Sequence, residues 1–352
     1  MSRLNCSGVV RLQDNIEVMF MNKEHKKALY SFPINEFKEK IHPFNQMIME
    51  QFLEQQHLSD YTLKQYRSAL MIFFTFVYKR CMNKPLYELK PRDALSFQNY
   101  LIASGLSPNA VKFKRSAVSS LCSFLELYYA DEYPNFRNIF NKAIPSIPKT
   151  NVKEKNPLTS QEIEYLLQEL EKREEWQKIA YVLFTYSTGC RKRESCQLLK
   201  EVITYDKYVD KRGNQKNFYV THPIRAKGRG KEGKVRRFQF NERAMQAIKK
   251  WIEYRQTLVE VDDCPYVFVS KRNGKFKQIH PDTFNVWCEE FSEILGKPVF
   301  PHLFRSSRAT ISVVEEGKDI KAVQKLLGHE SSQTTEIYVV RDDEDDLDEL
   351  FD

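Results

Sequence analysis

The chain has 352 residues, more than one compact domain usually contains, so we expect two units that each bury a core. The net charge is +8, but residues 341–352 hold eight acidic residues and one basic residue, which leaves +15 on the rest of the chain (+8 minus −7). A basic body with an acidic tip favours a polyanionic partner for the body, although plain solubility explains a charge excess equally well.

The cysteines are odd in number, are scattered along the chain and form no C-x-x-C pair. They are Cys6, Cys81, Cys122, Cys190, Cys196, Cys264 and Cys288. This usage excludes a disulfide framework and a zinc knuckle, and it indicates a reducing compartment. No signal peptide is evident, and the longest apolar run, residues 70–78, is too short to span a bilayer, so we expect a cytoplasmic protein without a membrane anchor.

The N-terminal half predicts a small helical bundle over residues 44–140. Apolar residues recur at helical spacing through residues 44–80, with Ser59 or Asp60 as a cap. A second helix follows Lys90 and breaks at Gly105, and a third begins at Ser107 before Pro108. Residues 1–43 are expected to form an N-terminal extension or small arm, with a short strand near residues 16–20.

Three basic residues early in the third helix are candidates for DNA contact, and a solvated helix face is an equally good interpretation. They are Lys112, Lys114 and Arg115.

Residues 141–157 read as a linker, because three prolines and four lysines interrupt a stretch with few apolar residues. A second unit then begins at Thr159, which forms a capping box with Glu162. Short β-branched runs within residues 202–240 predict a small antiparallel sheet, and helices resume after Asn241. The expected fold is therefore mainly α with a small antiparallel sheet in the second unit, over residues 158–340.

The first candidate site follows an apolar helix, in the run Thr188 to Glu194. Gly189 lets the chain turn and puts Arg191 at the start of the next helix, where its planar guanidinium can bind a phosphate. Glu194, one turn later, can hold Arg191 in orientation. A surface salt bridge is the simpler interpretation of this fragment alone.

Residues 224–235 combine glycines with many basic residues. The spacing from Gly228 to Lys234 matches a phosphate-binding loop, but Val235 stands where that loop needs Ser or Thr, and a strand follows, which excludes nucleotide binding. We expect a β-hairpin instead, with Lys227 as a proton donor at its tip; a solubilising basic turn is the alternative. The other basic residues would meet DNA phosphates, namely Arg229, Lys231 and Lys234.

Three further residues complete a candidate catalytic set. His302 and Arg305 stand at i and i+3 of a predicted helix and so share a face. His329 follows Gly328 in an L-G-H run, and Tyr338 comes nine residues later.

Taken in order, this pattern (T-G-x-R-x-x-E, a hairpin lysine, H-x-x-R, L-G-H and then Tyr) resembles the tyrosine recombinase family, also called the phage integrase family, over roughly residues 44–340. The resemblance implies that Arg191 and Arg305 clamp the scissile phosphate, that Lys227 protonates the leaving 5′ oxygen and that Tyr338 is the nucleophile. It also implies proton shuttling by His302, a phosphate hydrogen bond from His329 and support of the site by Glu194.

These residue types suit such chemistry, because a free phenol has a pKa of about 10 and needs nearby cations and a base to attack at neutral pH. A covalent phosphotyrosine keeps the energy of the broken bond, so no ATP is needed. We expect no cofactor and no catalytic metal.

The expected function is that of a site-specific DNA recombinase, an integrase or transposase of a bacterial mobile element. By resemblance, a homotetramer would act on two double-stranded DNA sites through a Holliday junction, helped by accessory DNA-bending or excision factors. The acidic tail, residues 341–352, would dock on a neighbouring subunit, unless it is a disordered end. The alternatives are a Xer-like resolvase of chromosome or plasmid dimers, a type IB topoisomerase and a catalytically inactive DNA-binding regulator.

Overall fold

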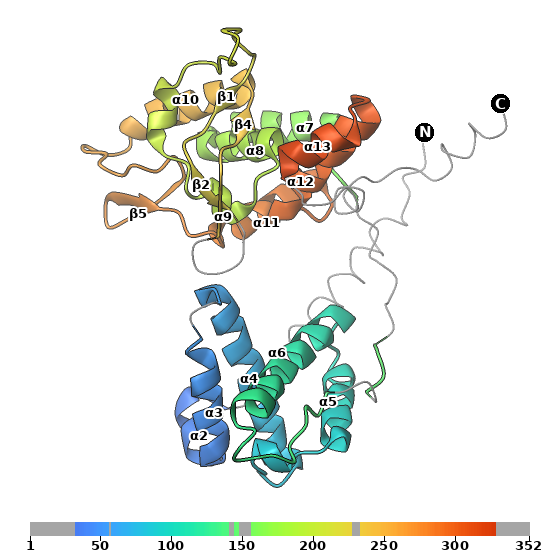
Figure 1. The fold of residues 1–352 in the computed structure, drawn as a ribbon. Coiled ribbons are helices and arrows are strands. Elements are labelled where there is room, and N and C mark those ends of the chain that lie inside the picture. The colour runs from blue at the N-terminus through green and yellow to red at the C-terminus, as the bar shows by residue number, and fades with distance from the viewer. Residues whose placement is uncertain (1–31, 56–57, 141–143, 148–155, 227–232, 329–352) are drawn as a thin grey trace, which may run out of the picture. The chain divides into compact units, whose positions relative to one another are not determined.

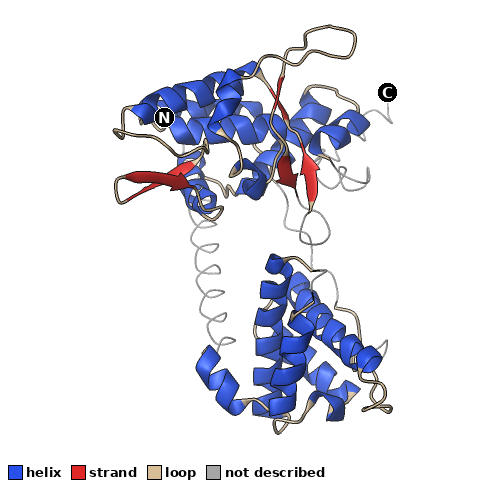
Figure 2. Cartoon of the chain, turned by 60° about the vertical axis from the view of Figure 1, so that its left-hand side comes forward, coloured by secondary structure: helices blue, strands red, loops and turns tan. Residues whose placement is uncertain are grey.

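The computed structural model describes residues 32–55, 58–140, 144–147, 156–226 and 233–328 (Figure 1). They fall into two compact units, one on each side of the expected linker. Helices dominate both units, and every strand in these ranges belongs to the second (Figure 2). The predicted fold class, mainly α with a small amount of antiparallel sheet in the second unit, is confirmed, and the sheet consists of two-stranded pairs. The expected arm strand, most of the linker and the acidic tail lie outside the described residues.

The first unit is a helical bundle with one 3-10 turn. Its elements are α2 Ile34–Lys40, α3 Pro43–Leu53, α4 Asp60–Arg80, η1 Leu86–Glu88, α5 Pro91–Ala103 and α6 Pro108–Tyr128. As predicted, Ser107 caps α6 with its side chain, and Pro108 occupies the first turn. Phe73, Phe97 and Leu121 are among the fully buried side chains around which these helices pack.

Two boundaries of this unit differ from the sequence prediction. The helix expected over residues 44–80 is two helices, because α3 ends at Leu53 and Ser59 caps a new helix by accepting a hydrogen bond from the Thr62 amide. The bundle also begins before residue 44, since Phe37 and Ile41 are buried in its core. These two apolar residues sit among charged neighbours, which hides the helical stripe.

The second unit contains a helical core with short strand pairs at its edge. Its helical elements are α7 Ser160–Lys172, α8 Trp176–Thr188, α9 Lys192–Ser195, η2 Lys200–Thr204, α10 Glu242–Gln256, α11 Thr283–Leu295, α12 Pro301–Thr310, the π-helical η3 Ile311–Glu315 and α13 Ile320–Leu327. Helix α8 is central, and α7, α10 and α12 pack against it (Figure 1). The Thr159–Glu162 capping box and the Asn241 cap of α10 are present as predicted.

The strands of the described residues form three separate antiparallel pairs. They are β1 Tyr219–Val220 with β4 Gln239–Phe240, β2 Ile224–Ala226 with β3 Lys234–Arg236, and β5 Val269–Arg272 with β6 Lys275–Gln278. The sheet predicted within residues 202–240 begins later than expected, because residues 200–204 form the 3-10 turn η2. Val202 is buried in the core, and its amide donates to the carbonyl of Leu199, three residues earlier. The β5–β6 hairpin was not predicted, although the Asn273–Gly274 dipeptide of its turn is a recognised hairpin signal.

Candidate active site

The site begins where α8 ends. Gly189 adopts a left-handed conformation, φ 60°, and closes the helix, as glycine does without steric strain. The Thr188 hydroxyl then accepts a hydrogen bond from the Cys190 amide at 3.1 Å, which shapes the turn into α9. Arg191 is therefore the N-cap residue of α9, at the helix start that the sequence predicts.

A buried carboxylate holds Arg191. Glu194 is 2% exposed, and its two oxygens accept hydrogen bonds from the Arg191 backbone amide at 2.6 Å and from Nη1 at 3.0 Å. Arg191 itself remains 31% exposed, so the guanidinium is anchored on one side and reaches solvent on the other. The predicted i, i+3 contact is thus present in the structure, while its part in catalysis stays a prediction.

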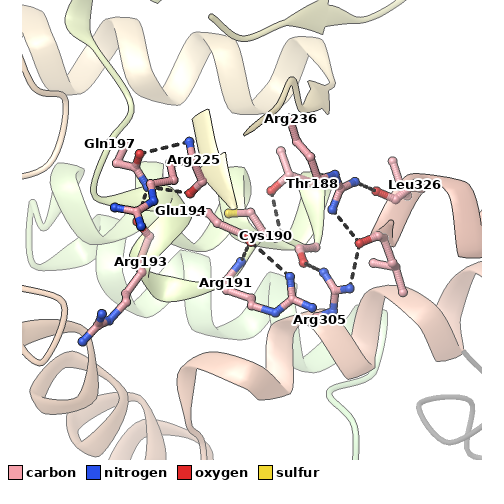
Figure 3. A network of polar contacts seen from close by, with 12 residues as sticks. Thr188, Cys190, Arg191, Arg193, Glu194, Gln197, Arg225, Arg236, Arg305 and Leu326 are labelled. Carbon is pink, nitrogen blue, oxygen red and sulfur yellow. Dashed lines mark hydrogen bonds and ion pairs between the residues drawn. The ribbon is translucent and has the colours of Figure 1, made fainter. Parts of the chain in front are cut away.

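Arg305 of α12 is fully buried and joins two other elements. Its Nη1 donates to the Gly189 carbonyl at 2.5 Å, and its Nη2 donates to the Leu327 carbonyl at 2.7 Å (Figure 3). The guanidinium therefore lies between the turn that carries Arg191 and the end of α13. His302 lies one turn earlier on α12 and is half-buried.

Arg236 belongs to the same network, and sequence reasoning missed it. From β3, its Nη1 donates to the Leu327 carbonyl at 2.8 Å and its Nη2 to the Leu326 carbonyl at 3.0 Å (Figure 3). Its guanidinium also lies 4.9 Å from the centroid of the Phe238 ring. Residues 224–237 contain so many basic side chains that their spacing alone does not distinguish Arg236. The signal that could have identified Arg236 is its position opposite buried Ile224 in a strand pair.

The hairpin explains why this segment is no nucleotide-binding loop. Lys234 opens the strand β3, where a phosphate-binding loop would start a helix, and it pairs with Ala226. Lys234 is exposed, at the end of the strand pair next to the turn of the hairpin. Lys227, Arg229 and Lys231 lie outside the described residues.

The C-terminal end of α13 closes the described part of the site. Gly328 ends the helix in a left-handed conformation, φ 66°. A Cβ atom there would lie 2.2 Å from Cζ of Arg236, so only glycine allows this close approach. His329 and Tyr338 follow in sequence and lie outside the described residues.

Cys190 lies within this turn but is chemically quiet. Burial raises the pKa of its thiol to about 12, and the nearby Glu194 carboxylate acts in the same direction. The thiol therefore stays protonated at neutral pH and packs as a small apolar group.

The three basic residues predicted for DNA contact on α6 differ in their surroundings. Lys112 is exposed and Lys114 is half-buried. Arg115 donates from Nη1 to the Pro145 carbonyl at 3.1 Å and lies over the Phe140 ring, and burial lowers the pKa of its guanidinium. Its described contacts are thus within the unit, where it ties the segment 144–147 to the bundle.

The described residues contain neither a membrane-spanning helix nor a cluster of metal ligands. None of their helices combines the length and apolarity that crossing a lipid bilayer requires. The same residues contain no group of three or more His, Cys, Asp or Glu side chains that could hold a metal ion.

Both units of the chain match family models of phage integrases. The model described as "Phage integrase family" matches residues 156–345, and the model described as "Phage integrase, N-terminal SAM-like domain" matches residues 47–129. The SPbeta prophage-derived recombinase-like protein YomM of Bacillus subtilis is 28% identical over 319 residues, which cover 89% of this chain and 92% of the relative. Tyrosine recombinase XerA of Pyrococcus furiosus is 32% identical over 255 residues, 72% of this chain and 77% of the relative.

Solved structures share the fold. The Tn1549 transposon integrase in complex with circular intermediate DNA matches with a TM-score of 0.62 at 18% identity, over 88% of this chain and 99% of that one. A lambda integrase tetramer bound to a Holliday junction matches with a TM-score of 0.57 at 15% identity, over 84% and 77% of the two chains. At these identities the likeness concerns the fold alone.

Proposed function

The chain belongs to the phage integrase family and is a tyrosine-type site-specific DNA recombinase, and we propose that Tyr338 is its nucleophile. One observation carries the proposal: Arg191 and Arg305, far apart in sequence, meet at the Gly189 turn, and Arg305 also holds the helix end that leads to His329 and Tyr338. Such a cluster of fixed cations suits a phosphodiester whose negative charge grows in the transition state.

The proposed reaction exchanges one phosphodiester for another. The Tyr338 hydroxyl attacks the scissile phosphorus and forms a bond to the 3′ phosphate, while the bond to the 5′ oxygen breaks and Lys227 supplies a proton to that oxygen. Arg191 and Arg305 stabilise the non-bridging oxygens, with His329 donating a further hydrogen bond, and His302 moves the proton taken from the phenol. Attack by a 5′ hydroxyl reverses the step and seals the strand.

Double-stranded DNA sites are the proposed partners, and a mobile genetic element of a bacterium is the proposed setting, with the enzyme in the cytoplasm. The prophage-derived relative supports this setting, because 89% of this chain aligns with it. The identity to XerA of Pyrococcus furiosus favours a second candidate, a resolvase of replicon dimers. Two kinds of plasmid distinguish them: an integrase should join separate plasmids that carry one site each, whereas a resolvase should act on two sites within one plasmid.

We further propose that four copies act on two sites, with accessory DNA-bending or excision factors, and that residues 341–352 dock on a neighbouring copy. The net charge of −7 on this tail would suit a basic partner surface. Deletion of residues 342–352 should weaken synapsis of two sites while DNA binding is kept. Unchanged tetramer formation, measured by native gel shift, would overturn the docking proposal.

The central test is trapping on DNA. In a nicked duplex that carries the bound site, cleavage releases the short fragment with the 5′ hydroxyl, so the strand cannot be resealed. The covalent complex should therefore accumulate with wild-type protein and be absent with Tyr338→Phe. End-labelling should reveal a blocked 3′ end and a free 5′ hydroxyl. Absence of the complex with wild-type protein would favour an inactive DNA-binding regulator, and relaxation of plasmids that lack the site would favour a topoisomerase.

A further inference from the structure

The C-terminal end of α13 is held from outside the helix. The last carbonyls of any α-helix lack intrahelical donors and need other partners. Here the Leu326 and Leu327 carbonyls both accept from Arg236, and Leu327 accepts from Arg305 as well. Two guanidinium groups from different elements therefore converge on the carbonyl of Leu327, 91 residues downstream of Arg236 (Figure 3).

We propose that Arg236 is a positioning residue for strand cleavage: by clamping the Leu326 and Leu327 carbonyls to the β2–β3 hairpin, it fixes the point from which the chain continues to His329 and Tyr338. The inference rests on the proposed function, because it assigns no new reaction to the protein. Arg236 would act through the helix end and would not touch the scissile phosphate.

Three features fit a guanidinium at this place. Its two Nη groups donate to two successive carbonyls, a fork that lysine cannot reproduce with one ammonium group. The Phe238 ring supports its face at 4.9 Å. Gly328 leaves room for it, since any Cβ there would overlap the guanidinium. A merely solvated basic side chain would have none of these contacts.

The clamp also joins two parts of the proposed machinery. Arg236 pairs with Ile224 in the strand pair whose other end is Ala226, the residue before Lys227. One side chain thus connects the hairpin that would carry the proton donor with the helix end that leads to the nucleophile. Misplacement of reacting groups by about 1 Å can reduce a rate about 100-fold, so a loosened clamp should slow cleavage more than it weakens binding.

The test uses the full chain and nicked DNA in single-turnover cleavage at saturating protein, with Arg236→Gln and Arg236→Lys. We expect the rate of covalent-complex formation to fall about 10- to 100-fold in both variants, with DNA affinity changed less than about 3-fold. Arg237→Gln is the matched control, because Arg237 is the adjacent residue, carries the same charge and is exposed. It should leave the cleavage rate at saturation unchanged.

A second arm separates positioning from direct phosphate contact. A methylphosphonate at the scissile position removes the negative charge that a contacting arginine would neutralise. Positioning predicts the same fold-reduction for Arg236→Gln on this neutral linkage, whereas a direct contact predicts that the reduction disappears. Equal rates for Arg236→Gln and wild type, or rescue by the neutral linkage, would overturn the inference. Failure of wild-type protein to cleave at all would instead overturn the proposed function.

Discussion

Among the described residues, the first unit buries the uncharged polar side chains Asn45, Thr75 and Gln98, whereas the second unit buries the charged Glu194, Arg255 and Arg305. Ion pairs of the first unit, such as Arg67 with Glu50, lie at its surface, and both side chains of that pair are almost half exposed. Burying a charge is unfavourable unless hydrogen bonds replace the lost water. The second unit therefore bears the unfavourable free energy of burying charged side chains, whereas the described part of the first unit does not.

The two buried arginines of the second unit, Arg255 and Arg305, have different structural roles. Arg255 donates to the Asp262 carboxylate at 2.5 Å and to the Cys264 carbonyl at 2.9 Å, both in the loop just after its own helix α10. Arg305 instead joins three elements, α12, the Gly189 turn and α13. Although both arginines are fully buried, Arg255 stabilises a loop next to its own helix, whereas Arg305 lies at the centre of the candidate site.

The largest expected effect distinguishes these two arginines. Arg305→Gln should lower the single-turnover cleavage rate per folded molecule at least about 100-fold, because it removes a donor from the proposed phosphate site. Arg255→Gln should chiefly reduce the free energy of unfolding, by about 3–5 kcal/mol, since it leaves Asp262 without its buried partner. Cleavage kinetics and urea unfolding measure both. An equal loss of rate per folded molecule in Arg255→Gln would remove the distinction.

Substitution by alanine should lower the free energy of unfolding by different amounts at Gly189 and Gly317, although both glycines have a left-handed φ of 60°. In Gly189→Ala the new Cβ would lie 2.3 Å from Cδ2 of buried Leu327, whereas Gly317 has no neighbour within 4 Å of such an atom. Both variants bear the cost of a left-handed alanine, about 1–2 kcal/mol, and Gly189→Ala should lose about 1–3 kcal/mol more through overlap. Urea unfolding that gave equal losses would contradict the packing of Leu327 against Gly189.

In the first unit, Lys112 and Arg115 should separate DNA binding from bundle stability. Lys112→Gln should weaken DNA binding and reduce the salt dependence of log K by about one, as loss of one phosphate contact does. Arg115→Gln should instead reduce bundle stability by about 1 kcal/mol, because it removes the bond to the Pro145 carbonyl. Salt titrations and thermal unfolding measure the two quantities. A salt slope that falls for Arg115 and stays constant for Lys112 would reverse their assignment.

The smallest effect concerns Cys190. Its thiol pKa of about 12 lies far above pH 8, so about one molecule in 10,000 carries the thiolate there. Iodoacetamide should therefore label Cys190 much more slowly in folded protein than in urea, because the reactive thiolate is scarce and the side chain is buried. Peptide mass spectrometry measures the labelling. Equal rates in folded and unfolded protein would contradict the burial of this turn.

Much of the architecture follows from local signals. The caps Ser59, Ser107, Thr159 and Asn241 each begin a helix, because their side chains accept backbone donors within the next turn. The break between α3 and α4, the start of the bundle before residue 44 and the 3-10 turn at residues 200–204 were missed. In the last two places tertiary burial, of Ile41 and of Val202, overrides the local pattern.

The site was predictable in part. The spacing of Arg191 and Glu194 predicts their contact, since i and i+3 share a helix face. The burial of Arg305 and the clamp made by Arg236 were not predictable, because both depend on carbonyls of residues far away in sequence. Backbone acceptors are identical in every residue, so no sequence pattern marks them.

Mass spectrometry of the trapped protein–DNA complex tests the central claim most directly. After digestion with protease and nuclease, one peptide should carry a nucleotide linked through its 3′ phosphate, and fragmentation should locate that nucleotide on Tyr338. A nucleotide on any other residue, or unmodified Tyr338 in a complex that resists denaturation, would contradict the account.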